Sequence, residues 1–154
     1  MTLLHRVAAL CLLALAPTAA PAFSEADLLP VDQAFQLQAQ APRRDGIELH
    51  WTIAKGYYLY RHRISVKPAA GFVAGTLTLP PGHRKHDEFF GEVETYRDQL
   101  RAVQAGRAAD GVDTVTLEVH YQGCADAGVC YPPQKRSVQV ALPRAAATLP
   151  PAAP

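Results

Sequence analysis

The sequence predicts an all-β domain, a sandwich of two antiparallel sheets, and three observations support this prediction. Apolar and polar residues alternate along several short segments, Gly, Pro or Asp residues bound these segments, and no window of a dozen residues carries a helical stripe of apolar side chains. Each such strand has one apolar face that must be buried. Two sheets packed face to face bury these faces economically.

The first 22 residues are expected to be a cleaved signal peptide (residues 1–22). Arg6 supplies a positive charge, residues 7–16 are apolar, and residues 20–22 fit the small-x-small pattern of a cleavage site. The apolar run is shorter than the ~20 residues that a membrane-spanning helix needs, so no stable membrane insertion is expected. An uncleaved anchor or a buried helix is the alternative. Cleavage would also remove Cys11 and leave two cysteines.

The charge balance argues against a nucleic-acid partner. The chain has 15 Lys and Arg residues against 14 Asp and Glu residues, and loss of Arg6 would leave the mature chain neutral. No basic block is longer than three residues, so neither nucleic acid nor an anionic membrane surface is an expected partner.

One domain is expected over residues 23–142. Its strand segments, in order, are residues 35–39, 47–53, 76–79, 100–103, 115–121 and 138–142. Trp51 lies in the cleanest alternating segment and is predicted to be a core residue. Residues 143–154 are rich in Pro and Ala and are expected to be a disordered tail.

The two remaining cysteines, Cys124 and Cys130, lie on the connection between the last two predicted strands. An even number of cysteines in an exported protein points to a disulfide. Gly123 and Gly128 free the backbone to turn, and the prolines at 132–133 end the strand ladder. A loop of this kind can bring the two Cα atoms within the roughly 4.4–6.8 Å that a disulfide needs.

Two interpretations of this disulfide stay open on the residues alone. It is either a structural staple or a redox-active pair. Closing so short a loop stabilises the fold by at most about 2–3 kcal/mol, and a staple would usually join distant strands. A local pair can open without unfolding the sandwich, which suits redox chemistry.

No metal site and no cofactor are predicted. His83, His86 and Asp87 provide too few ligands in a recognisable geometry. Neither a Ser-His-Asp order nor a phosphate-binding glycine loop is present, and the adjacent acids Asp87 and Glu88 do not suit glycosidase chemistry.

Four stretches of the chain resemble one known family. Residues 121–133 resemble the active-site loop of the N-terminal periplasmic domain of the DsbD thiol:disulfide interchange family. The others occur in the same order as in that family, from about residue 31 to 140. They are residues 31–35, which resemble the domain's start, residues 56–61, which resemble its tyrosine-rich segment, and residues 87–91 with 96–98, which resemble its cap loop.

The resemblance implies an immunoglobulin-like sandwich in the periplasm that acts as a protein-disulfide reductase module. In that family, the domain takes electrons from a thioredoxin-like domain and passes them to acceptors such as a DsbC-like isomerase or a cytochrome c maturation thioredoxin. Members usually continue into a membrane domain and a thioredoxin-like domain, whereas this sequence stops at Pro154. Whether it is a stand-alone version or a truncated copy, the donor is expected on a separate chain. The alternative is an immunoglobulin-like binding module whose disulfide is a staple.

The resemblance also implies roles for individual residues. Cys130 would form the mixed disulfide with each partner, and Cys124 would resolve it. Phe89 would cap the disulfide, and the charges of Asp87 and Glu88 would disfavour the thiolate. Tyr58, Tyr60 and Tyr131 would form walls of the site. For each of these aromatic residues, ordinary packing is the alternative. Because the nearest basic residues in sequence are Lys135 and Arg136, no strongly depressed thiol pKa is expected.

Overall fold

The predicted strands are present in the computed structural model, which describes residues 28–69, 71–88 and 90–144. A one-turn helix comes first, and almost everything after it is strand. The elements are α1 (Val31–Ala34), β1 (Phe35–Arg43), β2 (Gly46–Ile53), β3 (Tyr57–Tyr60), the 3₁₀ turn η2 (Arg61–Arg63), β4 (Ser65–Pro68), β5 (Phe72–Thr78), β6 (His83–Asp87), β7 (Gly91–Tyr96), β8 (Gln99–Ala108), β9 (Thr114–Tyr121), β10 (Gly123–Ala125) and β11 (Gln134–Ala141).

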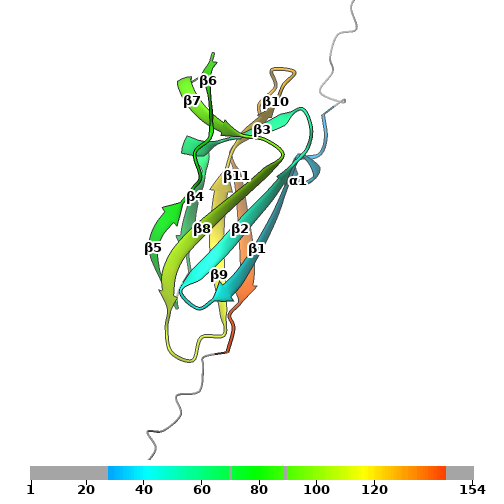
Figure 1. The fold of residues 1–154 in the computed structure, drawn as a ribbon. Coiled ribbons are helices and arrows are strands. Elements are labelled where there is room, and N and C mark those ends of the chain that lie inside the picture. The colour runs from blue at the N-terminus through cyan, green and yellow to red at the C-terminus, as the bar shows by residue number, and fades with distance from the viewer. Residues whose placement is uncertain (1–27, 70, 89, 145–154) are drawn as a thin grey trace, which may run out of the picture.

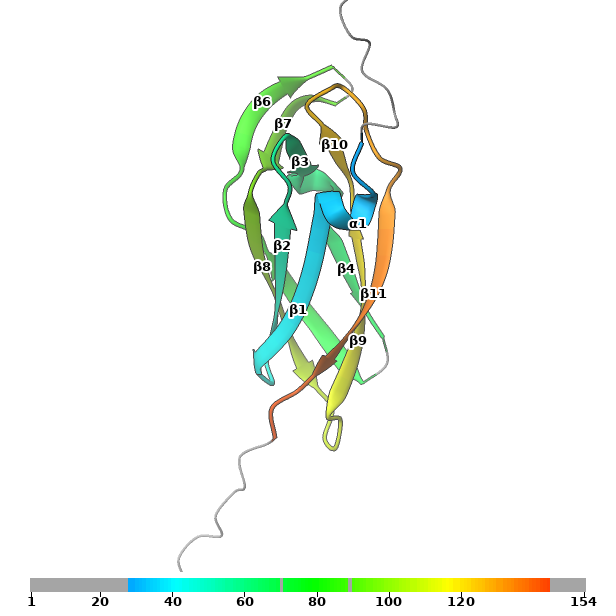
Figure 2. The same ribbon diagram turned by 90° about the vertical axis from the view of Figure 1, so that its right-hand side faces the viewer.

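Two antiparallel sheets form the larger part of the molecule, which we call the body. One sheet has the strand order β1-β2-β8-β5 and the other β11-β9-β4. They face each other, with β1 beside β11 at one margin (Figures 1 and 2). The predicted fold class, an immunoglobulin-like antiparallel sandwich, is therefore confirmed.

The body core follows from the alternation in the sequence. Along β2 and β9, every second side chain points inward and is buried, and Trp51 is completely buried as predicted. The Trp51 ring packs edge-on against Tyr121, with 6.0 Å between the ring centres. Burying a large apolar side chain of this kind contributes about 1.5–3 kcal/mol relative to leaving it in water.

A third sheet, which we call the head, lies at one end of the body (Figure 1). Its strand order is β10-β3-β7-β6. The chain passes from the body into the head between β2 and β3, which follow each other closely. It returns from the head to the body between β7 and β8, through a turn at Arg97 and Asp98. Asp98 has a positive φ of 58°, a conformation that Asp tolerates better than most residues.

The head strands were not predicted, and the physical reason is their side-chain pattern. All four residues of β3 are buried, so its two faces show no apolar–polar alternation. Strand β6 reads His-Arg-Lys-His-Asp and has no apolar residue at all. Of the residues predicted as a cap loop, Asp87 ends β6, Glu88 and Phe90 lie in a turn, and Gly91 begins β7.

The described part of the chain contains no helix with the length and hydropathy needed to cross a membrane. The predicted signal peptide lies outside the described residues, as does the predicted tail beyond Arg144. The limits of the predicted domain thus stay predictions.

Candidate active site

Cys124 and Cys130 form a disulfide at the edge of the head. The S–S distance is 2.06 Å and the Cα–Cα distance is 4.0 Å. The latter is below the window expected from sequence. The two residues face each other as a non-hydrogen-bonded cross-strand pair, the kind whose Cα atoms lie closer together. Backbone hydrogen bonds on both sides of the pair hold the loop, from Ala125 N–H to the Val129 carbonyl at 2.8 Å and from Tyr131 N–H to the Gly123 carbonyl at 3.0 Å.

Gly123 sets the position of β10 and therefore of Cys124. A Cβ atom at this position would lie 2.4 Å from the Tyr58 carbonyl oxygen and 2.5 Å from Cζ of Phe35. Strand β10 can thus approach both β3 and the body core only because residue 123 has no side chain. The next residue, Cys124, pairs with Tyr58.

The two cysteines differ in burial. Cys124 is completely buried in a small cluster with Tyr58, Tyr60 and Val93, whereas Cys130 packs against this cluster and is only partly buried. Cys130 is thus the less enclosed cysteine of the pair.

A tyrosine and a buried carboxylate lie beside the inner sulfur. The Tyr60 hydroxyl donates a 2.7 Å hydrogen bond to Oδ2 of Asp87, and its oxygen lies 3.5 Å from the Cys124 sulfur and 3.5 Å from the Tyr58 hydroxyl oxygen. Burial, together with the hydrogen bonds to Tyr58 and Asp87, raises the pKa of Tyr60. Tyr60 therefore stays protonated, with its single hydroxyl proton donated to Asp87.

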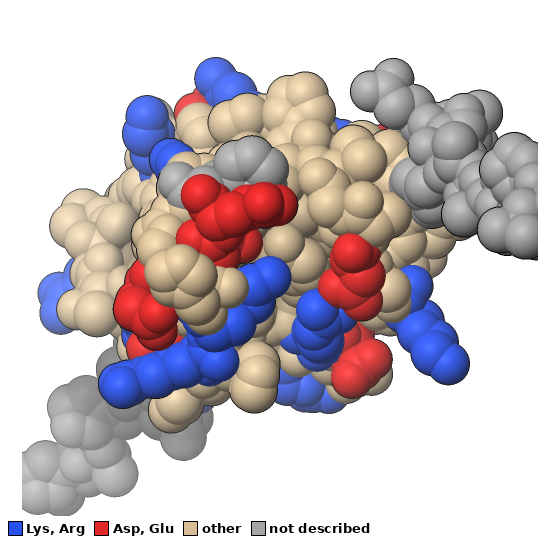
Figure 3. Space-filling model, turned by 90° about the horizontal axis from the view of Figure 1, so that it is seen from above, with Lys and Arg blue, Asp and Glu red and all other residues tan. Residues whose placement is uncertain are grey.

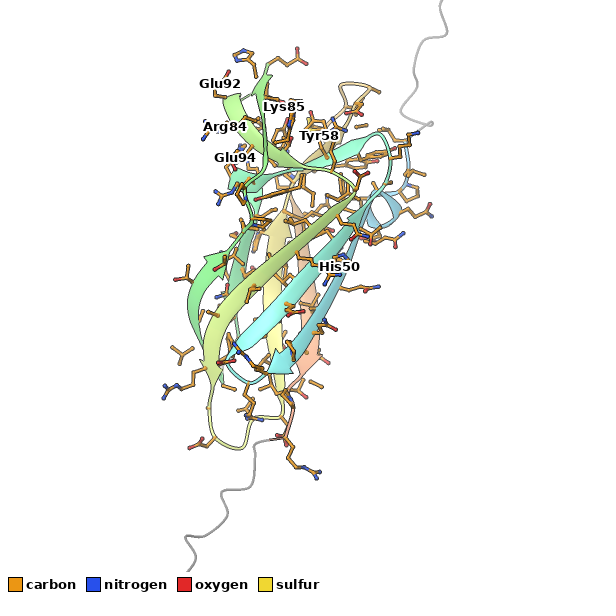
Figure 4. The ribbon with its side chains drawn as sticks, in the orientation of Figure 1. His50, Tyr58, Arg84, Lys85, Glu92 and Glu94 are labelled. Atoms are coloured by element: carbon orange, nitrogen blue, oxygen red, sulfur yellow. A yellow bond between two sulfur atoms is a disulfide. The ribbon has the colours of Figure 1, made fainter. Side chains whose placement is uncertain are left out.

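Two cations that the sequence analysis did not identify stand over Tyr58. Nζ of Lys85 lies 4.1 Å from the centre of the Tyr58 ring and 3.6 Å from Oδ2 of Asp87, and the Arg97 guanidinium lies 5.1 Å from the same ring. Figure 4 shows Lys85 and Tyr58 on the same side of the head. Both cations are distant from the cysteines in sequence, so only the sheet register reveals them.

Arg97 also holds the cysteine loop itself. Its two terminal nitrogens donate hydrogen bonds of 3.0 and 2.6 Å to the two carboxylate oxygens of Asp126, the residue two positions after Cys124. These hydrogen bonds lower the pKa of Asp126, and the Asp126 carboxylate is thereby neutralised by a partner. The Asp126 N–H additionally donates to the Gly56 carbonyl at 2.8 Å.

The remaining predicted site residues lie at different distances from the cluster. Asp87 is buried at the end of β6, whereas Glu88 is exposed in the turn that follows. Phe89 is outside the described residues. Tyr131 follows Cys130 but packs on the body core, with its ring centre 5.5 Å from that of Phe35, and burial raises its pKa to about 12.

Phe90 is an aromatic residue of the site that the sequence analysis missed. The Phe90 ring packs edge-on against the rings of Tyr60 and His62, with 5.1 Å between ring centres in each case. The Arg63 guanidinium lies 4.5 Å from the centre of the Phe90 ring. Its N–H donates a 3.2 Å hydrogen bond to Oδ1 of Asp87. The signal was present in the sequence as a second phenylalanine directly before Gly91.

Viewed from above, the head carries acidic and basic side chains interleaved over its surface (Figure 3). Among the residues that the structure describes, no three His, Cys, Asp or Glu side chains gather as metal ligands would. His86 instead pairs with Glu92 at 2.8 Å.

Comparison with known proteins gives one consistent family. Residues 25–142 match the family described as "Thiol:disulfide interchange protein DsbD, N-terminal". The DsbD proteins of Cronobacter sakazakii and Ralstonia nicotianae are 45% and 44% identical over 139 and 147 residues, which cover 87% and 94% of this chain. The same alignments cover 23% and 24% of those proteins, so this chain spans about a quarter of their length.

Two solved structures agree with this. The reduced DsbD N-terminal domain of Neisseria meningitidis is 32% identical, with a TM-score of 0.69 over 77% of this chain and 94% of that one. A complex between the DsbD N-terminal and PilB N-terminal domains of the same organism is 36% identical, with a TM-score of 0.60 over 73% of this chain and 87% of that one.

Proposed function

Because this chain belongs to the family of DsbD N-terminal domains, we propose that its Cys124–Cys130 pair exchanges electrons with other proteins in the periplasm. The observation that carries this proposal is the difference in burial between the two cysteines. Cys130 is only partly buried, whereas Cys124 is enclosed among Tyr58, Tyr60 and Val93. An exchanging pair needs one sulfur for the partner and one that is held back to resolve the mixed disulfide.

In the proposed reaction, a donor thiolate attacks the Cys130 sulfur. A new S–S bond to the donor forms, the Cys124–Cys130 bond breaks, and Cys124 leaves as a thiolate that takes up a proton. A second donor thiolate then attacks the donor sulfur of the mixed disulfide, which releases an oxidised donor and the reduced Cys130. Two electrons have moved to this domain.

Delivery to an acceptor runs the same steps in reverse. The Cys130 thiolate attacks the acceptor disulfide and expels one acceptor thiolate. The Cys124 thiolate then attacks the Cys130 sulfur, expels the second acceptor thiolate and restores the disulfide. The Tyr60 hydroxyl oxygen lies 3.5 Å from the Cys124 sulfur, so its one proton can turn from Asp87 to the Cys124 thiolate when that thiolate forms.

The charged side chains near the cysteine pair would control how readily Cys124 forms a thiolate. The Asp87 carboxylate, one tyrosine away from Cys124, disfavours a thiolate there, and Lys85 partly offsets this effect. In this proposal, Glu88 is a second acidic residue that disfavours the thiolate, and Phe89 is the cap over the disulfide. We expect a slow reaction with small oxidants and a faster one with a docked partner.

The proposed partners follow from the family. The donor is a thioredoxin-like domain, and the acceptors are periplasmic disulfide proteins such as a DsbC-like isomerase or a cytochrome c maturation thioredoxin. The solved complex of a related domain with a PilB N-terminal domain supports direct contact with another protein. No cofactor is required by this chemistry.

The reduction potential of the Cys124–Cys130 pair tests the proposal. The protein is equilibrated against glutathione or dithiothreitol buffers, free thiols are trapped, and folding is followed by circular dichroism. Structural disulfides typically have reduction potentials below about −300 mV. We expect a higher potential for this pair, and a reduced protein that stays folded. A lower potential, or unfolding upon reduction, would identify the disulfide as a staple in a binding module.

A further inference from the structure

Reduction of the disulfide leaves a negative charge on a buried sulfur. Cys124 is completely buried, and its cluster partners Tyr58, Tyr60 and Val93 are uncharged side chains. Burial among such side chains raises the pKa of a thiol, and a thiol of higher pKa is a poorer leaving group. A positive charge close to this cluster would therefore help Cys124 to leave.

Charged side chains reach the cluster from strand β6, from the β7–β8 turn and from the cysteine loop. The turn supplies Arg97 and the loop supplies Asp126, and the two hydrogen bonds between them largely cancel these two charges. Strand β6 supplies Asp87 and Lys85. The balance of charge at the sulfur thus depends on how Lys85 and Asp87 interact.

The sheet register places Lys85 over the cluster. Lys85 lies directly opposite Val93 in the β6–β7 pairing, and residues opposite each other point to the same face of a sheet. The Lys85 ammonium lies 4.1 Å from the centre of the Tyr58 ring, and its side chain is 29% exposed. A side chain held in this way covers apolar surface with its stem and keeps its charge near solvent. Figure 4 shows Arg84, the preceding residue, on the other side of the hairpin.

A continuous series of contacts connects the Lys85 ammonium to the Cys124 sulfur. Nζ of Lys85 lies 3.6 Å from Oδ2 of Asp87, the oxygen that accepts the Tyr60 hydroxyl proton at 2.7 Å. The Tyr60 oxygen lies 3.5 Å from the Cys124 sulfur. Because Lys85 offsets the charge of Asp87, this carboxylate holds the Tyr60 proton less strongly. The proton can then turn toward the sulfur as the S–S bond breaks and its electron pair moves onto Cys124.

We propose that Lys85 is a positioning residue for the exchange reaction, which pairs with Asp87 and thereby releases the Tyr60 hydroxyl to stabilise the Cys124 thiolate. The O–H bond of Tyr60 stays intact, and only its hydrogen bond moves from the carboxylate to the sulfur. Without Lys85, the charge of Asp87 would retain the Tyr60 proton and repel the thiolate. This inference rests on the proposed redox function, and it names the residue that sets the acidity of the resolving thiol.

The experiment measures the pKa of the Cys124 thiol by NMR, from the carbon shift of its labelled Cβ atom. The whole chain carries Cys11→Ser and Cys130→Ser, so that Cys124 is its single thiol. Lys85→Met removes the cation and keeps an unbranched apolar stem, so the pKa should rise by about one unit. Lys85→Arg keeps the charge and should leave the pKa nearly unchanged. Lys67→Met is the matched control, because it removes a lysine from β4 in the body.

A second substitution tests whether Lys85 acts through Asp87. In an Asp87→Asn background, Lys85→Met should raise the Cys124 pKa about half as much or less, because the carboxylate that Lys85 offsets is absent. Lys85→Gln repeats the measurement with a polar side chain in case Met disturbs the packing over Tyr58. Circular dichroism checks that each variant is folded.

The rate of disulfide reduction gives an independent readout in chains that retain both cysteines. Stopped-flow reduction of Lys85→Met by dithiothreitol should be about threefold slower than that of the wild type, because the leaving thiol has a higher pKa. Lys85→Arg should recover the wild-type rate, which a loss of packing alone would not predict.

Two results would overturn the role of Lys85. One is an unchanged Cys124 pKa in both Lys85→Met and Lys85→Gln. The other is an equal rise with Asp87 and with Asn at position 87, which would mean that the ammonium does not act through the carboxylate. Either result would leave the redox function standing if the unsubstituted pair has the potential of an exchanging disulfide and the reduced protein stays folded. A potential in the structural range, together with the expected pKa shifts, would refute the redox function alone.

Discussion

The body and the head bury very different kinds of side chain. The body core is built from aliphatic and aromatic residues around Trp51, whereas the head cluster consists of two tyrosines, one valine and a cysteine. Strand β3 separates the two, because Tyr57 and Leu59 face the body core and Tyr58 and Tyr60 face the head. The comparison teaches that stability and reactivity are assigned to different clusters, so that one can change without the other.

Trp51→Ala should have the largest effect and should act on stability alone. Removing this fully buried side chain leaves a cavity in the body, at a cost of about 3–5 kcal/mol of unfolding free energy. Chemical denaturation measures the loss. In the fraction that remains folded, the reduction rate with dithiothreitol should match the wild-type rate. A strongly altered rate would show that the two clusters are coupled.

Gly123→Ala tests the place where the two clusters meet. The added methyl group would collide with the Tyr58 carbonyl and with Phe35, which belongs to the body core. We expect a loss of about 1–3 kcal/mol from overpacking, together with a changed reduction potential, because β10 carries Cys124. Ala125→Gly, on the same strand, serves as a control for β10 itself. If the potential stayed constant while stability fell, β10 would not set the geometry of the pair.

Tyr60→Phe should change reactivity more than stability. It removes a hydroxyl that donates to Asp87 and lies beside the Cys124 sulfur, at a cost of about 1–2 kcal/mol. Stopped-flow reduction by dithiothreitol should slow several-fold, because the leaving thiolate loses a hydrogen bond. Tyr131→Phe is the matched control, since Tyr131 packs on the body core. Equal rates in wild type and Tyr60→Phe would exclude the proposed role.

Asp126→Asn should produce the smallest effect, and it should depend on pH. The Arg97 hydrogen bonds lower the pKa of Asp126 in the fold, so its contribution to stability is present above the unfolded value of about 3.9 and is lost as the pH falls through the lower folded value. Melting temperatures of wild type and variant should differ slightly at pH 7 and converge in strong acid. A difference that persisted at pH 2 would argue against this ion pair as the cause.

The sequence predicted the body better than the head, for a physical reason. Strands of the body have one buried and one exposed face, so Ile47 to Ile53 alternate visibly, and Trp51 was placed in the core from that pattern alone. Tyr57–Tyr60 is buried on both faces and carries no such pattern. The contacts of Lys85 and Arg97 with Tyr58 depend on strand register, which composition and spacing do not encode.

The same limit applies to the site. The disulfide was expected from two cysteines in an exported chain, but the difference in burial between Cys124 and Cys130 arises because only Cys124 lies on a strand that packs against Tyr58. In the sequence, Asp126 is a negative charge between the two cysteines, with no cation close to it along the chain. The structure instead pairs it with Arg97, which lies 29 positions earlier in the chain.

The direct cross-strand pairing of Cys124 with Cys130 has a kinetic consequence for any covalent complex. Backbone hydrogen bonds on both sides hold the two residues opposite each other, and these bonds do not involve sulfur. The resolving thiol therefore stays beside the mixed disulfide at a high effective concentration. The lifetime of the covalent complex would then be set by an intramolecular reaction, and the affinity of the interface would decide how long the partner stays once its disulfide is reduced.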